Sequence, residues 1–222
     1  MILIFDLDDT LYPEIQFAIS GFKAVANYVY LNFGVPAEES FQILSGALDL
    51  GERDQAFQKL ILSKSLPKGL IRKLIAVYRS HKPEIKLDEV VTDVFKMYSD
   101  ISKYIVTDGN KLVQRNKIKA LGLDNIVKRS FVTHSFGLNA SKPSLICFEK
   151  IKHLEKVEWK DLIYVGDDPK KDFVNLKPLG VTTVRVLSGR HSAINASEEF
   201  DAEFHISGFE ELVKVLDSRY EP

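Results

Sequence analysis

The sequence IFDLDDTLYP, residues 4–13, places three aspartates and a threonine directly after an apolar run. Residues 2–5, ILIF, have the composition of a strand buried on both faces of a parallel sheet. Three carboxylates at the end of such a strand repel one another and are costly to remove from water. The crowding predicts that a cation meets these residues, so the ends of the other strands become the places to examine.

Composition bounds the class of protein. The chain has 222 residues, of which 45% are hydrophobic, which is enough for one substantial core or a core with a satellite. Thirty basic and 31 acidic residues leave a net charge of −1, which argues against a nucleic-acid partner. Only four apolar residues separate Met1 from Asp6, and no run approaches a membrane-spanning length. The single cysteine, Cys147, excludes an internal disulfide. We therefore expect a cytoplasmic globular protein without a membrane partner.

Short apolar runs alternate with helix-like segments along most of the chain. The runs are residues 2–5, 101–107, 129–133, 162–165 and 181–187. The helix-like segments are 110–121, 144–155, 170–178 and 208–217. In 110–121 and just beyond it, Leu112, Ile118, Leu121 and Leu123 roughly follow one helical face. Strands separated by helices of this length predict repeated β-α-β units, and hence an α/β fold with a parallel sheet.

Residues 14–83 interrupt this alternation. They have helical spacing throughout and no convincing strand. An apolar stripe is formed by Phe17, Phe22, Val25, Val29 and Phe33, and Gly34 is a suitable helix stop. We therefore expect an all-helical domain over 14–83, inserted into a core formed by 1–13 and 84–222, with Pro13 and Pro83 as stiff hinges.

The residues that follow the predicted strands share one chemistry. Ligands of parallel α/β sheets bind outside the carboxyl ends of the strands, so these residues are expected to converge. They are Asp6, Asp8, Asp9 and Thr10 after the first strand, Thr107, Asp108 and Gly109 after the second, and Gly166, Asp167 and Asp168 after the fourth, with Asp172 close behind. Lys142-Pro143 stands just before the segment 144–155. Several carboxylates with one lysine and no nearby His or Cys favour Mg²⁺ as the counter-ion.

Taken together, DLDDT, TDG, SKP and GDDPKKD resemble the four motifs of the haloacid dehalogenase superfamily, in the same order and at similar separations. The resemblance covers about residues 1–190. It implies a Rossmann-like three-layer core with a parallel sheet, and it identifies the helical insertion with the family's helical cap of the first type.

The resemblance also implies roles. Asp6 would be the nucleophile that forms an aspartyl-phosphate, and Asp8 would be the general acid and then the base, with its backbone carbonyl on Mg²⁺. Thr107, with Asp108 and Gly109 beside it, would bind the phosphoryl group, and Lys142 would neutralise charge between that group and Asp6. The implied metal set is Asp6, Asp8, Asp167 and Asp172, with Asp172 either on the ion or supporting it.

Two positions depart from the family pattern. Asp108 stands where Asn is more frequent, and it either adds charge near the phosphate or caps the helix that begins near Asn110. Asp168 stands where Ser or Thr is frequent. The five histidines show no metal-ligand spacing, so we interpret each as a structural or a surface residue. We expect Lys170 and Lys171 to face solvent.

The function that the resemblance favours is a Mg²⁺-dependent phosphatase for a small phosphate monoester, such as a nucleotide, a sugar phosphate or a phosphoglycolate-like compound. A phosphosugar mutase shares the capped layout and remains an alternative. A 2-haloacid dehalogenase uses the same nucleophile without metal, but it lacks an acid at the position of Asp8. A catalytically silent binding domain would show a damaged motif, and all four are intact here.

Overall fold

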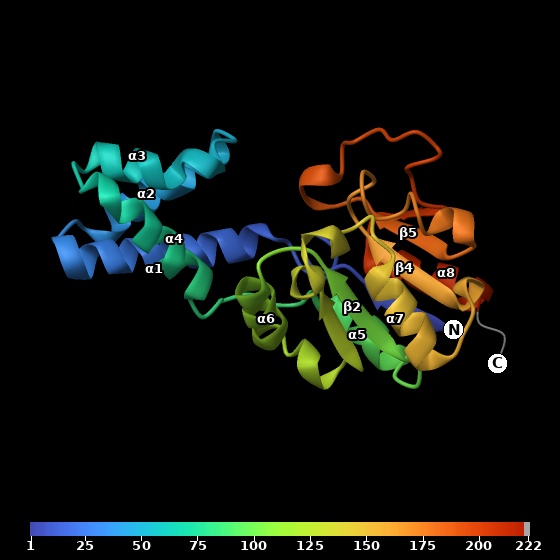
Figure 1. Cartoon of the computed structure of the whole chain (residues 1–222). Coiled ribbons are helices and arrows are strands. Elements are labelled where there is room, and N and C mark those ends of the chain that lie inside the picture. The colour runs from blue at the N-terminus through green and yellow to red at the C-terminus, as the bar shows by residue number, and fades with distance from the viewer. Residues whose placement is uncertain (220–222) are drawn as a thin grey trace. The chain divides into compact units, whose positions relative to one another are not determined.

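The computed structural model describes residues 1–219, which divide into two compact units. One unit contains Met1–Glu14 and the chain from Lys86 on, and the other contains Ile15–Ile85. The first is an α/β unit and the second is helical (Figure 1). No helix within residues 1–219 is both long and apolar enough to cross a membrane.

The α/β unit is built on a six-stranded sheet in the order β3-β2-β1-β4-β5-β6. Every neighbouring pair is parallel. The strands are β1 (Ile2–Phe5), β2 (Lys103–Thr107), β3 (Arg129–Val132), β4 (Leu162–Gly166), β5 (Thr182–Val186) and β6 (Phe204–Ile206). Because β1 lies in the middle and the strand order reverses around it, the carboxyl ends of β1, β2 and β4 meet. The predicted α/β fold with a parallel sheet is confirmed.

Helices cover both faces of the sheet, which confirms the predicted three layers. On one face, Ile4 and Tyr164 belong to a buried cluster that contains Phe148 of α7 (Ile146–Glu155). On the other face, the Phe5 ring lies 5.0 Å from that of Phe95 in α5 (Glu89–Met97) and 6.1 Å from that of Phe209 in α8 (Phe209–Arg219). All four residues of β1 are buried because each of its faces is covered.

Helix α6 (Lys111–Ala120) differs from the expected pattern on its inner face. Leu112 is 51% exposed, so it does not share the buried face as predicted. That face contains Ile118 together with two polar residues, Gln114 and Lys117. Asn110 caps the helix by accepting hydrogen bonds from two backbone N–H groups, so the predicted capping role of Asp108 is wrong.

Two further elements of the α/β unit differ from the prediction. The segment 170–178 is not an α-helix but a series of turns that leads into a short 3-10 helix at Lys177–Leu179. Pro178 cannot donate a helical hydrogen bond, and the buried Asp172 side chain accepts backbone N–H groups instead of facing solvent. Strand β6 was not predicted, because only three residues pair there and one of them is exposed.

The helical unit contains α1 (Ile15–Phe33), α2 (Ala37–Asp49), α3 (Ala56–Ser63) and α4 (Ile71–Ser80). Its core joins Phe22, Val25 and Val29 of the predicted stripe to residues of the other helices, including Leu44 and Leu74. Helix α1 ends where the stripe ends, and the left-handed backbone of Gly34 (φ +70°) follows it. Phe33, at the end of the stripe, is 38% exposed.

Replacing Phe148 tests the core on the α7 face. Phe148→Ala should lower the free energy of unfolding of the α/β unit by about 3–5 kcal/mol, because it leaves a cavity beneath α7. Trp159, the only tryptophan of the chain, packs against the same cluster, so its fluorescence during urea unfolding reports on this unit. Leu154→Ala on the same helix is the matched control, since Leu154 is 51% exposed and should cost less than about 1 kcal/mol. Equal losses in the two variants would contradict this description of the core.

Candidate active site

Asp6 and Asp167 follow neighbouring strands at the centre of the sheet. Phe5 of β1 is paired with Val165 of β4, and Asp6 continues the ladder by donating its backbone N–H to Val165 (2.8 Å). Both aspartates are almost fully buried. Carboxylate oxygens of Asp6, Asp167 and Asp172 lie within 4.8 Å of one another. The structure thus brings together the three side chains predicted to hold the metal, while Asp8 was expected to contribute its backbone carbonyl.

Lys142 supplies the positive charge in this cluster. Its Nζ lies 2.9 Å from Asp6 Oδ1 and 2.7 Å from Asp172 Oδ1, and it donates a hydrogen bond to the Tyr164 hydroxyl (2.9 Å). Burial alone would lower the pKa of Lys142, but the charges of Asp172 and Asp6 hold it well above its usual value. The lysine therefore stays an ammonium ion, and it tethers the segment before α7 to the ends of β1 and β4.

Asp172 is occupied on both oxygens. Oδ1 receives Lys142 and the Tyr164 hydroxyl (3.1 Å), and Oδ2 receives the backbone N–H groups of Asp167 (3.2 Å) and Asp168 (2.9 Å). Gly166 makes this close approach possible, because a Cβ at this position would lie 2.6 Å from Asp172 Oδ2. These contacts hold the Asp167 backbone in place, which favours a supporting role for Asp172 over direct contact with an ion.

The charges of the cluster suit a divalent cation. Three carboxylates and one ammonium leave two negative charges among Asp6, Asp167, Asp172 and Lys142. Burial, together with repulsion from Asp172, raises the pKa of Asp6 to about 6 despite Lys142. Burial and the charges of Asp6 and Asp172 raise the pKa of Asp167 to about 8. Buried carboxylate oxygens that repel one another in this way are the donors that Mg²⁺ prefers, so the residues present fit the ion.

The three predicted phosphate-binding residues at the end of β2, Thr107, Asp108 and Gly109, make different contacts. The Thr107 hydroxyl is buried and accepts a hydrogen bond from Gln114 Nε2 (2.7 Å). Asp108 accepts from the Thr133 hydroxyl (2.7 Å) and from the backbone N–H of Lys142 (3.1 Å), so it links β2 and β3 to the lysine segment. Gly109 has a φ of +124°, a conformation that other residues rarely adopt.

The Asp8 carboxylate lies apart from the Asp6 cluster, against α6. It accepts hydrogen bonds from the Tyr12 hydroxyl (2.6 Å), Gln114 Nε2 (2.9 Å) and Lys117 Nζ (2.7 Å). Burial works to raise the pKa of Asp8, but Lys117 and the other two donors outweigh it and hold the pKa below its usual value. Asp8 therefore rests as a carboxylate.

Sequence reasoning missed several residues that contact the predicted ones, among them Tyr12, Gln114, Lys117, Thr133, Tyr164 and His191. His191 Nδ1 lies 2.8 Å from Asp167 Oδ2, although the sequence analysis assigned this histidine no part in the site. Gln114 and Lys117 left a signal, because they interrupt the apolar face of α6 with polar groups. His191 left none, since it lies in a short 3-10 helix (Gly189–His191) 24 residues after Asp167, away from any predicted strand end.

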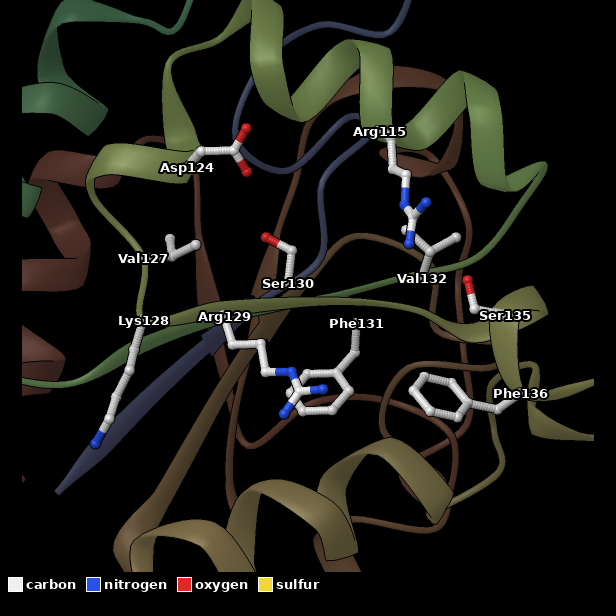
Figure 2. A pocket seen from close by; sticks show the side chains of 10 residues that line it. All are labelled: Arg115, Asp124, Val127, Lys128, Arg129, Ser130, Phe131, Val132, Ser135 and Phe136. Atoms are coloured by element: carbon white, nitrogen blue, oxygen red, sulfur yellow. The ribbon is translucent and has the colours of Figure 1, made fainter.

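A cavity of about 390 Å³ lies elsewhere, between α6 and the edge strand β3. Figure 2 shows Arg115 reaching toward it from α6, while the guanidinium of Arg129 lies over the Phe131 ring, 5.0 Å from the ring centroid. None of the predicted site residues lines this cavity.

Comparison with known proteins decides the family. The family model described as haloacid dehalogenase-like hydrolase matches residues 3–186. The chain belongs to this family. The prediction of a hydrolytic enzyme of the haloacid dehalogenase superfamily, made from the four motifs, is therefore confirmed.

Relatives match over nearly the whole chain. A glyceraldehyde 3-phosphate phosphatase from Methanocaldococcus jannaschii is 28% identical, and the match covers 96% of each chain. A 2-haloacid dehalogenase from Pseudomonas syringae superposes with a TM-score of 0.67 at 18% identity, over 99% of this chain and 100% of the other. A putative HAD-hydrolase from Bacillus subtilis, solved with bound magnesium, superposes with a TM-score of 0.66 at 20% identity, over 97% and 98% of the two chains. At these identities the two structures show the shared fold alone.

The raised pKa values predict how pH affects the metal-free protein. Asp6 and Asp167 bind their protons more tightly in the folded state than in the unfolded chain, where carboxyl groups titrate near pH 4. Between about pH 4 and pH 8 these two groups therefore hold more protons in the folded state, so their contribution to its stability should fall as pH rises. The melting temperature, measured in a chelator, should decrease between pH 5 and pH 8. Added Mg²⁺ should raise it more at pH 8, because ligands must be ionised to bind the ion.

Asp167→Asn is the control for this titration. It removes the group with the higher pKa, so its melting temperature should change less between pH 6 and pH 8 and respond weakly to Mg²⁺. A melting temperature of the wild type that rises over this interval in the chelator would contradict the assignment.

Proposed function

We propose that the protein is a Mg²⁺-dependent phosphatase that hydrolyses a small phosphate monoester through an aspartyl-phosphate on Asp6. The observation that carries the proposal is the buried contact of Asp6 with Lys142, beside Asp167, while a second carboxylate, Asp8, is held separately. A nucleophile and a proton-transfer group with different surroundings are what two-step phosphoryl transfer requires.

In the first step, an Asp6 carboxylate oxygen attacks phosphorus, and the bond from phosphorus to the ester oxygen breaks. The leaving oxygen takes a proton from Asp8. Asp8 must be protonated at that stage, and the negative phosphate beside it favours this because a like charge raises the pKa of a carboxyl group. Lys142 stabilises the negative charge that shifts onto the phosphoryl oxygens, and the Thr107 hydroxyl binds one of them.

In the second step, Asp8 removes a proton from water, which attacks phosphorus and breaks the bond to Asp6. Inorganic phosphate is released, and Asp8 regains its proton. The three donors on Asp8 favour the ionised form, which is the form that accepts a proton from water.

Asp6 and Asp167, with the backbone carbonyl of Asp8, would hold Mg²⁺, and Asp172 would fix the Asp167 backbone from behind. When bound, the ion would neutralise charge on the phosphoryl group and reduce repulsion between it and the carboxylates. Asp8, absent from dehalogenases of the family, favours phosphate chemistry over a 2-haloacid substrate.

Three-carbon sugar phosphates are the first substrates to test. The proposal follows from the relatives of this chain that carry the name glyceraldehyde 3-phosphate phosphatase, which match over 96–98% of its length. Purified protein should release phosphate from glyceraldehyde 3-phosphate or from another member of a panel of small esters. Chelation should abolish this activity and Mg²⁺ should restore it.

Asp6→Asn is the decisive variant in that assay. It should retain less than about 1% of the wild-type kcat, because removal of a covalent nucleophile blocks both steps. Its fold should persist, since the change removes one of three repelling carboxylates. Full activity in the chelator, or substantial turnover by Asp6→Asn, would refute the proposed mechanism.

We further propose that the helical unit, residues 15–85, acts as a cap that restricts the substrate to small molecules. Its insertion directly after the Asp6–Tyr12 segment supports this role. Small esters should therefore be hydrolysed at least about a hundredfold more efficiently than folded phosphoproteins, as measured by kcat/KM. Short phosphopeptides are substrates of intermediate size, and their kcat/KM should lie between those of the small esters and the folded phosphoproteins. Comparable kcat/KM values for small esters and intact phosphoproteins would refute the cap.

A further inference from the structure

Helix α6 presents two buried polar side chains to the loop that carries Asp8. Gln114 and Lys117 are three residues apart, so they lie on the same face of the helix. Lys117 Nζ lies 2.7 Å from Asp8 Oδ1, and the exposed fraction of the Lys117 side chain is only 4%. An ammonium ion is costly to bury, and here it lies against Asp8, a carboxylate of the predicted site that is not part of the Asp6 cluster.

Gln114 contacts a predicted catalytic residue, Asp8, and a predicted phosphoryl-binding residue, Thr107, at once. Its Nε2 donates to Asp8 Oδ2 (2.9 Å) and to the Thr107 hydroxyl oxygen (2.7 Å). The direction of these bonds is determined by chemistry, because a carboxylate only accepts and the Gln114 carbonyl oxygen would be repelled by it. Since Thr107 accepts a hydrogen from Gln114, the hydrogen of its own hydroxyl is left to donate elsewhere. A phosphoryl oxygen is the acceptor that the proposed reaction supplies.

Both oxygens of Asp8 are therefore held. Oδ1 receives Tyr12 and Lys117, and Oδ2 receives Gln114. A carboxylate held by three donors has little rotational freedom, which is what a group needs if it must meet a leaving oxygen and later a water molecule at the same place. An alternative is that the Lys117–Asp8 ion pair only attaches α6 to the sheet. That purely structural role would require neither the hydrogen bond from Gln114 to Thr107 nor donors on both oxygens of Asp8.

We propose that Gln114 and Lys117 are positioning residues of the phosphatase site: Lys117 fixes the Asp8 carboxylate, and Gln114 orients the Thr107 hydroxyl toward the phosphoryl group. This inference rests on the proposed function and assigns to α6 a part that the four motifs do not contain. It predicts different defects for the two residues, because one acts on the proton-transfer group and the other also acts on phosphate binding.

Lys117→Met should lower kcat at least about tenfold for an alkyl phosphate such as glycerol phosphate, since a loosened Asp8 protonates the poor leaving group less well. For p-nitrophenyl phosphate, whose leaving group needs little protonation, the loss should be clearly smaller. Lys117→Arg keeps the charge and should recover much of the activity. Lys119→Met, at an exposed position on the same helix, is the matched control and should behave as wild type.

Gln114→Glu preserves size but replaces the donor by a carboxylate. Thr107 would then donate its hydrogen to Glu and no longer to phosphate, and the new charge would repel Asp8. We expect KM for both esters, and the inhibition constant of orthovanadate, to rise at least about tenfold. Gln114→Met, which removes the donor without adding charge, should weaken vanadate inhibition in the same direction but by less.

The outcomes separate the inference from the function. If the wild type hydrolyses no ester, the proposed function fails and this inference fails with it. If the wild type is active and sensitive to Asp6→Asn, equal losses on both esters with unchanged vanadate inhibition overturn the inference alone. Trp159 fluorescence during thermal unfolding shows whether each variant is folded. Should Lys117→Met not fold, the result with Gln114→Glu decides, and unchanged KM and vanadate inhibition there overturn the inference.

Discussion

The buried ammonium of Lys142, held between Asp6 and Asp172, is the interaction on which the rest of the site depends. It joins three parts of the chain that are far apart in sequence: the end of β1, the segment before α7 and the turn after β4. Without it, three carboxylates would share a region that excludes water, and the ends of β1 and β4 could not carry charge so close together. With it, two negative charges still remain among the four groups. The same balance that allows the cluster to fold leaves it able to attract a divalent cation.

The site has two halves with opposite electrostatic character. Around Asp6 and Asp167, burial and like charges raise the carboxyl pKa values, so the metal-free site favours protons. Around Asp8, donors from α6 and Tyr12 lower the pKa and favour the ionised form. Thr107 is joined to the Asp8 half through its hydrogen bond with Gln114. Two aspartates separated by a single residue thus have pKa values shifted in opposite directions, because their surroundings and not their identities set their protonation.

The fold by itself does not select among the reactions of this family. The chain superposes on a 2-haloacid dehalogenase over nearly its full length, and with a similar TM-score on a hydrolase solved with magnesium. The architecture is common to both, so the distinction has to come from individual side chains. Asp8 and the buried acids after β4 are the side chains on which the proposed phosphatase function rests, and two of the donors on Asp8 come from α6, outside the four motifs.

The sequence alone determined the parallel sheet, the helical insertion and the approximate meeting of Asp6, Thr107, Lys142 and Asp167. It could do so because apolar periodicity is local and parallel strands place their carboxyl ends at one edge of a sheet. The ends of α1 and of β1 were predictable for the same reason. Only the tertiary structure decided which loop the inner face of α6 meets, and so brought Gln114 and Lys117 to Asp8 across 106 and 109 residues. Likewise it placed His191 on Asp167, turned Asp108 toward Thr133, and made 170–178 a series of turns. A polar residue on a helix shows in the sequence that a partner is needed, but packing of the whole chain chooses the partner.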